Sequence, residues 1–94
     1  MKVYCNRRYV TIDKDGGKLS TINPNQFHSV ELVKRNSQQD MTTLYLRWNF
    51  GCSEVGYPDM QCYIEEYQTF AEAKQMHDSI LAAFNLANIM AAKE

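Results

Sequence analysis

The chain has 94 residues, of which 45% are hydrophobic and 12% aromatic, and its formal net charge is −1. This composition predicts a single folded domain over residues 1–94, and it excludes intrinsic disorder and the strongly basic character of most general nucleic-acid binders. No apolar run reaches the roughly 18 residues of a membrane span. The N-terminal residues also lack the apolar stretch of a signal peptide, so we expect a cytoplasmic protein with no membrane partner.

The first expected strand covers residues 3–13. Its apolar positions change parity half-way, so that no straight strand can place them all on one face. A one-residue bulge near Arg7–Arg8 would bring them together on the core face. These apolar residues are Val3, Cys5, Val10 and Ile12.

Turn and break signals divide the residues that follow. The Asp-Gly-Gly sequence at 15–17 predicts a turn, because both glycines can adopt positive φ. Residues 18–22 then form a short return strand, which the proline-containing stretch 23–25 ends. The next expected strand covers residues 27–34, and the polar residues 36–40 connect it to its successor.

Residues 42–50 alternate most clearly between apolar and polar side chains, which predicts a strand with one buried face. Residues 51–59 contain two glycines and a proline and predict a loop. Residues 61–67 form the last strand. We expect its Cys62 and Ile64 to face the core and its Tyr63, Glu65 and Tyr67 to face solvent.

One long helix is expected over residues 69–92. Thr69 followed by Glu72 has the spacing of a capping box, in which the Thr69 hydroxyl accepts from the Glu72 backbone N–H and the Glu72 carboxylate reaches back to the cap. The first half of this helix has a single apolar stripe, but between residues 80 and 92 the only polar side chains are Asn85 and Asn88. A helix that is apolar all round requires burial all round.

These elements predict an α+β fold, in which an antiparallel meander of four to five strands (1–67) carries the helix on one face. So short a chain has little surface with which to surround the helix tail. We therefore expect self-association, with a dimer as the first expectation, although packing on the chain's own sheet or on a foreign partner remains open. The expected oligomer interface consists of Ala83, Leu86, Ala87, Ile89 and Met90.

A second candidate surface is the face of the sheet opposite the helix. Arginine and tyrosine dominate many binding surfaces because they combine a large contact area with a polar tip. Paired arginines beside a bulge also suit a phosphate or carboxylate group. The candidate ligand- or partner-binding residues are Arg7, Arg8, Tyr45, Arg47, Tyr63 and Tyr67. The opposing interpretation is that Arg7 and Arg8 are two solvated arginines that pair with Glu31 or Glu65.

Catalysis and cofactor binding have little support in the sequence. His28 and His77 stand apart from any serine or cysteine motif, so no catalytic residue is assigned. The three cysteines match no zinc-binding spacing and indicate reduced thiols, with no metal and no cofactor expected. The alternative metal site would use Cys5, Cys52, Cys62 and His28.

The function expected from the sequence is that of a small non-enzymatic binding protein, which self-associates through its C-terminal helix and binds a protein partner. A compact chain without a catalytic motif suits a phage-type inhibitor of a host enzyme. The alternative is a binder of single-stranded nucleic acid or of a small phosphorylated ligand through the sheet face. A third expectation is a structural subunit of a larger assembly.

Overall fold

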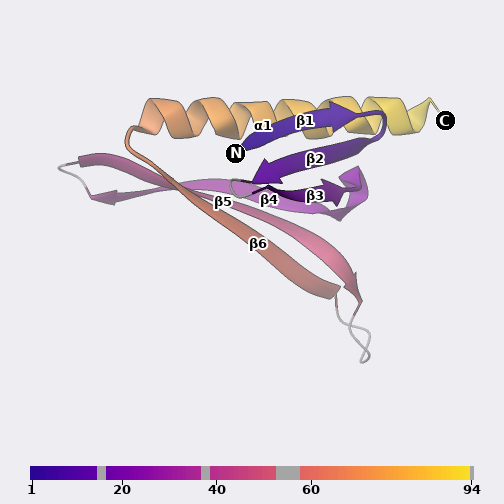
Figure 1. The fold of residues 1–94 in the computed structure, drawn as a ribbon, viewed down its shortest axis with the longest axis horizontal. Helices are drawn as coiled ribbons and strands as arrows, with labels where there is room; N and C mark the ends of the chain where they lie inside the picture. Colours follow the sequence, from indigo (N-terminus) through magenta and orange to yellow (C-terminus); the bar gives the residue numbers. More distant parts are fainter. Residues whose placement is uncertain (15–16, 37–38, 53–57, 94) are drawn as a thin grey trace. The chain divides into compact units, whose positions relative to one another are not determined.

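The computed structural model describes residues 1–14, 17–36, 39–52 and 58–93. Within these ranges the chain is α+β, as predicted, with six strands in two three-stranded antiparallel sheets and one C-terminal helix (Figure 1). A short 3-10 turn, η1 (Pro24–Gln26), separates the two sheets along the chain. The elements are β1 (Lys2–Asn6), β2 (Tyr9–Lys14), β3 (Lys18–Ile22), β4 (Phe27–Asn36), β5 (Gln39–Cys52), β6 (Pro58–Tyr67) and α1 (Phe70–Ala92). The expected meander of four to five strands is therefore wrong in strand number and in the number of sheets.

The chain divides into two compact units. The first contains residues 1–27 and 79–94, and so combines sheet β1–β2–β3 with the C-terminal half of α1. The second contains residues 28–78, with sheet β4–β5–β6 and the N-terminal part of α1. The single domain expected from the sequence stays a prediction, and we describe each unit by itself.

The first unit begins with a tight hairpin where the sequence predicted one bulged strand. Asn6 pairs with Tyr9, so Arg7 and Arg8 form a two-residue turn between β1 and β2. The bulge is therefore wrong, but its expected consequence is present, because Val3 pairs with Ile12 and Cys5 with Val10 on one face of the sheet. The two central positions of the turn hold arginines, where hairpin turns favour glycine, asparagine or aspartate, so the sequence gives no signal for the reversal. The four apolar residues then meet through chain reversal.

Arg7 occupies a backbone conformation that suits glycine better, with φ at +57°. Its carbonyl oxygen accepts a hydrogen bond from the Cys5 thiol, over 3.0 Å, which holds the turn closed. A side chain at positive φ costs about 1–2 kcal/mol, part of which glycine loses again through its greater freedom in the unfolded chain. We expect Arg7→Gly to raise the free energy of unfolding by about 0.5–1 kcal/mol. Urea unfolding measures this change.

A matched variant, Arg8→Gly, separates backbone conformation from loss of charge. Arg8 is not among the residues of the described chain with positive φ, so glycine there relieves no strain. This control is expected to leave the stability unchanged or to lower it. Equal stabilisation by both substitutions would contradict the assignment of strain to Arg7.

The core of the first unit lies between its sheet and α1. Val10, Ile12 and Ile22 are fully buried. On the helix, Ile80 and Ala87 are fully buried and Phe84 is 3% exposed. The Phe84 ring lies 4.5 Å from that of Phe27, centroid to centroid, at an interplanar angle of 36°. Aromatic rings at this separation and tilt attract beyond their buried area.

The expected turn, strand and break between residues 15 and 25 are found wherever the structure describes them. Asp15 and Gly16 lie outside the described residues, and Gly17 has φ at +80°, which glycine adopts without steric cost. Strand β3 has the predicted bounds. After it, the Asn23 side chain accepts from the Asn25 backbone N–H over 3.3 Å, and the Gln26 side chain accepts from the Asn23 backbone N–H over 2.8 Å. This capped turn ends the first sheet.

In the second unit, β5 is the central strand and buries the predicted side of its alternation. Leu44 and Leu46 are fully buried and Trp48 is 5% exposed. Strands β5 and β6 both extend further than expected into residues 51–59, whose members 53–57 lie outside the described residues. The apolar face of β5 therefore forms the centre of this unit.

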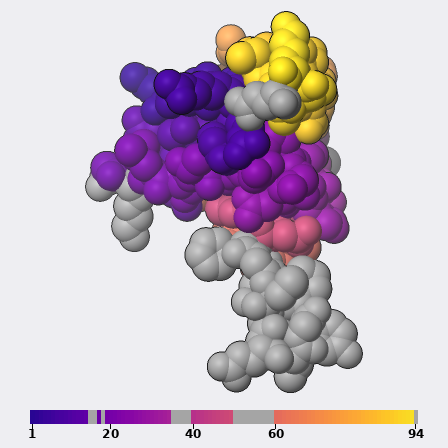
Figure 2. All heavy atoms as spheres, turned by 90° about the vertical axis from the view of Figure 1, so that its right-hand side faces the viewer, coloured from indigo at the N-terminus to yellow at the C-terminus, as the bar shows by residue number. Residues whose placement is uncertain are grey.

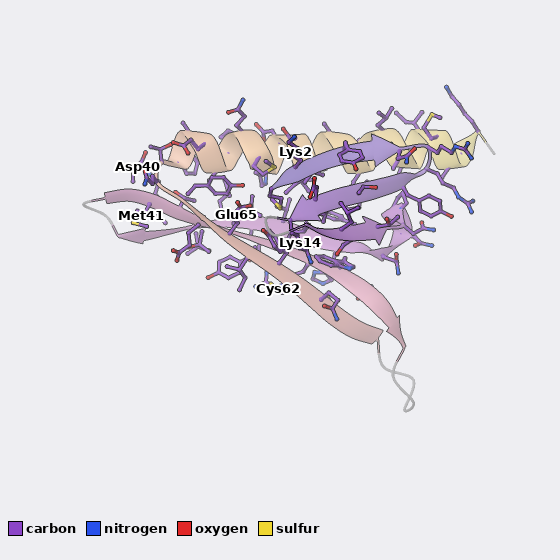
Figure 3. All side chains as sticks on the ribbon, viewed as in Figure 1. Lys2, Lys14, Asp40, Met41, Cys62 and Glu65 are labelled. Carbon is purple, nitrogen blue, oxygen red and sulfur yellow. The ribbon has the colours of Figure 1, made fainter. Side chains whose placement is uncertain are left out.

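The predicted orientation of β6 is wrong. Leu44 pairs with Glu65 and Leu46 with Tyr63, and directly opposed residues point to the same face of a sheet. The odd-numbered residues of β6 therefore lie on the buried face of β5, whereas Cys62 and Ile64 are exposed. Figure 3 labels one residue from each face of β6, Glu65 and Cys62. A tyrosine ring can cover apolar area while its hydroxyl stays near water, so either face of β6 satisfies the alternation.

The start of α1 contains the Thr69 half of the predicted capping box. The Thr69 hydroxyl accepts from the Glu72 backbone N–H over 3.2 Å. A strand residue adds a second cap, because Asp40 of β5 accepts from the Phe70 backbone N–H over 3.1 Å (Figure 3). Lys34 pairs with the same Asp40 carboxylate over 3.4 Å and lies 4.9 Å from the Phe70 ring centroid. Acidic groups stabilise a helix N-terminus by pairing with its free N–H groups.

Candidate functional site

The first candidate site is an apolar surface on the last turns of α1. Leu86 is 50% exposed, Ile89 is 54% exposed and Met90 is 37% exposed. Residues three and four positions apart lie side by side on a helix surface, so these three side chains form one patch. We call Leu86, Ile89 and Met90 the tail patch. Figure 2 shows this end of α1 in yellow, at the surface beside the indigo N-terminal strands of the same unit.

Two members of the expected oligomer interface point the other way. Ala83 is 8% exposed and Ala87 is fully buried within one chain. They continue the buried stripe of Ile80 and Phe84 at helical spacing. Ala83 and Ala87, which the sequence indicated for contact between two copies, are therefore packed inside the first unit. Of the expected interface, only Leu86, Ile89 and Met90 remain at the surface.

The expected Arg/Tyr-rich sheet face is not assembled as one surface. Tyr45 pairs with Ile64 and Arg47 pairs with Cys62, which places Tyr45 and Arg47 on the face opposite Tyr63 and Tyr67. Tyr63 and Tyr67 are half-buried, and the Tyr67 hydroxyl donates to Glu65 over 3.1 Å. Arg7 and Arg8 belong to the other unit. Of the six predicted binding residues, the four in the second unit therefore lie on two opposite faces of its sheet.

Arg47 is already neutralised by a neighbouring strand. Its Nη1 lies 3.1 Å from Glu31 Oε2, and its guanidinium carbon lies 5.3 Å from the centroid of the Tyr45 ring. The pairing of an arginine with Glu31 agrees in kind with the opposing interpretation from the sequence, although the arginine is Arg47. A cation held by both an acid and an aromatic face has less attraction left for a phosphate.

The two arginines of the β1–β2 turn lie at the surface. Arg8 donates to the Tyr9 hydroxyl over 3.0 Å, and its guanidinium carbon lies 5.2 Å from the Tyr9 ring centroid. Both arginines are exposed. Their role in binding stays a prediction.

The face of the second unit that carries Tyr45 and Arg47 includes residues that the sequence analysis did not select. Ile64 is 53% exposed and Met60 is 44% exposed, and both pair with the odd-numbered side of β5. Val33 is 45% exposed and lies two residues from Glu31, so it points to the same face of β4. We call this surface the open sheet face. It consists of Glu31, Val33, Tyr45, Arg47, Met60, Cys62 and Ile64.

A correct parity for β6 would have revealed this surface from the sequence. Met60, Cys62 and Ile64 alternate, as do Tyr63, Glu65 and Tyr67, and the wrong set was assigned to the core because it is the more hydrophobic. The register of β6 against β5 decides between the two sets. That register is fixed by the pairing across the β5–β6 connection, part of which lies outside the described residues.

The residues of the alternative metal site are not grouped where the structure describes them. Among residues 1–14, 17–36, 39–52 and 58–93, no three histidine, cysteine or acidic side chains are placed to hold a metal ion. Cys5 and Cys62 are free thiols, and the side chain of Cys52 lies outside the described set. His28 contacts the Ser29 hydroxyl over 3.2 Å.

An electrostatic cluster lies on the first half of α1. His77 Nδ1 lies 3.0 Å from Asp78 Oδ1, and Lys74 Nζ lies 3.4 Å from Asp78 Oδ2. The hydrogen bond from His77 is the main cause that lowers the pKa of Asp78 below its ordinary 3.8, and Lys74 lowers it further. The cluster is solvent-exposed at Asp78 and Lys74, which is typical of a helix surface.

This cluster predicts a measurable titration. A carboxyl group with a lowered folded-state pKa adds stability above its unfolded pKa, and that stability is lost as the pH falls through the folded pKa. For Asp78 this loss falls below pH 3.8. We expect carboxyl NMR of His77→Leu to show the Asp78 midpoint moving up toward its ordinary value. Lys74→Met should move it less, because the hydrogen bond from His77 is the larger cause. An unchanged midpoint in His77→Leu would contradict the assignment.

No helix among the described residues is long and apolar enough to span a bilayer. Comparisons of this chain with protein-family models, with characterised proteins and with solved structures gave no match.

Proposed function

We propose that this protein is a non-enzymatic binding protein that self-associates through the tail patch and acts by binding a protein partner. The observation that supports the proposal is the exposure of Leu86, Ile89 and Met90, at 50%, 54% and 37%, on one side of a helix whose other side is fully packed. Covering what remains exposed of Leu86 and Ile89 would contribute about 1 kcal/mol each.

The charge of the helix tail favours a second copy as the occupant of this patch. From Ser79 to Ala92 the sequence contains no acidic or basic residue. Pairing the patch with its own copy around a two-fold axis therefore brings no like charges together. Asn85 flanks the patch, four residues before Ile89, and can donate or accept across such an axis.

Mass measurement by light scattering tests the self-association. The wild type is expected to form an oligomer, and the double variant Leu86→Glu/Ile89→Glu is expected to have a lower mass, because two carboxylates would be buried without partners. Asn88→Glu/Ala92→Glu is the matched control. It adds the same two charges to the last turns of α1, at exposed positions outside the patch. A monomeric wild type at high concentration would refute the proposal.

The identity of the partner stays a prediction from the sequence, including the idea of a host enzyme blocked by a phage-type inhibitor. The alternative ligands, single-stranded nucleic acid and small phosphorylated molecules, gain no support from the geometry. Tyr45 and Arg47 lie on the other face of the sheet from Tyr63 and Tyr67, and the Arg47 guanidinium is 3.1 Å from the Glu31 carboxylate. Binding to a labelled oligonucleotide that weakens steeply with salt would revive that alternative.

A further inference from the structure

The open sheet face exposes several large apolar side chains on three adjacent strands. Val33 of β4 is 45% exposed, and Met60 and Ile64 of β6 are 44% and 53% exposed. Tyr45, half-buried on the central strand, lies directly opposite Ile64. Contiguous exposed apolar surface that is bordered by polar groups is typical of a protein interaction site.

In the middle of this face a positive and a negative side chain form an ion pair. The Arg47 guanidinium and the Glu31 carboxylate are 3.1 Å apart and belong to neighbouring strands. A partner that covers this ion pair must bring no uncompensated charge, because an unpaired buried charge is costly. A strongly basic or strongly acidic ligand does not meet this condition.

We propose that a second copy of this chain covers the open sheet face, packed around a two-fold axis. Such an axis turns the Arg47–Glu31 pair of one copy against that of the other, so that each arginine faces the glutamate of its mate and the apolar residues cover one another. This goes beyond the proposed function, because it adds a surface in the second unit to the tail patch of the first. Two different two-fold contacts on one chain build assemblies larger than a dimer.

A two-by-two set of variants tests this proposal by light scattering. Ile64→Glu disrupts the open sheet face, and Leu86→Glu/Ile89→Glu disrupts the tail patch. The wild type is expected to exceed the mass of a dimer, each variant to form a dimer, and their combination to be monomeric. Association through the sheet face should weaken at least tenfold, roughly, in Ile64→Glu. Gln61→Glu is the matched control, since it adds the same charge at an exposed position on the other face of β6.

The outcomes separate the two surfaces. The proposal is overturned if Ile64→Glu keeps the wild-type mass, or if the tail variant is already monomeric. If instead the tail variant keeps the wild-type mass and Ile64→Glu lowers it, the tail patch fails while the sheet-face contact stands. Val33→Glu repeats the test from β4, so that a folding defect of one variant, visible by circular dichroism, does not decide the result.

A charge swap tests whether the ion pairs of the two copies face each other. Arg47→Glu alone places like charges against each other and is expected to weaken association through this face. Glu31→Arg together with Arg47→Glu reverses both charges in both copies and should restore it. Failure of the swap to restore the mass, with both variants folded, overturns the proposal.

Cys62 provides a direct readout of coverage, because it is exposed on this face opposite Arg47. In a variant with Cys5→Ala and Cys52→Ala, Cys62 is the only thiol. Its reaction with Ellman's reagent is expected to slow several-fold as the protein concentration rises through the association range. An unchanged rate, while the mass remains above that of a dimer, overturns the proposal.

Discussion

Phe84→Ala is expected to lower the free energy of unfolding by about 3–5 kcal/mol, because it empties the centre of the first unit. Phe84 is 3% exposed and its ring lies 4.5 Å from the Phe27 ring. A loss of this size is a large part of the 5–15 kcal/mol or so by which ordinary domains are stable. Each kcal/mol corresponds to roughly 4–8 °C in the melting temperature of a chain of this length. Thermal unfolding followed by circular dichroism measures the loss.

The same variant tests whether the two units unfold together. Trp48 is the only tryptophan of the chain, is 5% exposed and belongs to the second unit, whereas Phe84 belongs to the first. In a single cooperative domain, the transition seen by Trp48 fluorescence moves together with the transition seen by circular dichroism. A Trp48 transition that stays at its wild-type position in Phe84→Ala would contradict the predicted single domain.

Leu81→Ala is the control for helix propensity and lost apolar area. Leu81 lies on the same helix but is 37% exposed, so its truncation leaves no closed cavity. The expected cost is about 1 kcal/mol. A loss as large as that of Phe84→Ala would show that the helix itself, and not the aromatic contact, dominates the stability of this unit.

Local patterns predicted the individual elements well where the chemistry is local. The cap at Thr69 marks the helix start, because one hydroxyl and one backbone N–H three residues on determine it. The alternation on β5 predicted the buried Leu44, Leu46 and Trp48. Strand β3 has the predicted bounds, since a glycine turn precedes it and a proline turn follows it. Each of these signals is complete within a few residues.

The failures concern relations between distant residues. No turn-forming residue marks the reversal at Arg7–Arg8, so one strand was predicted in place of a hairpin. The two faces of β6 both alternate, and only its register against β5 decides which is buried. On the helix tail, the apolar residues surround the axis, so the sequence did not distinguish the buried Ala87 from the exposed Leu86. The register of β6 also explains why the predicted binding residues Tyr45 and Arg47 lie on one face of the sheet and Tyr63 and Tyr67 on the other.

The second large effect is expected for Leu46→Ala in the second unit, at about 2–5 kcal/mol of lost stability. Leu46 is fully buried on the central strand and lies opposite Tyr63. Truncation there leaves a cavity between the sheet and the residues that cover it. Urea unfolding, monitored by Trp48 fluorescence on the same strand, measures the cost.

Ile64→Ala is the decisive comparison, because the two possible registers of β6 give it opposite outcomes. The sequence alone places Ile64 in the core, where its truncation would also cost about 2–5 kcal/mol. The structure pairs it with Tyr45 on the open sheet face and leaves it 53% exposed, so the expected cost in diluted, dissociated protein is below about 1 kcal/mol. Equal losses in Leu46→Ala and Ile64→Ala would show that the two faces of β6 are the reverse of those described. Ile64 would then belong to the core, and Tyr63 and Tyr67 would lie beside Tyr45 and Arg47. The apolar surface on which the sheet-face contact depends would not exist.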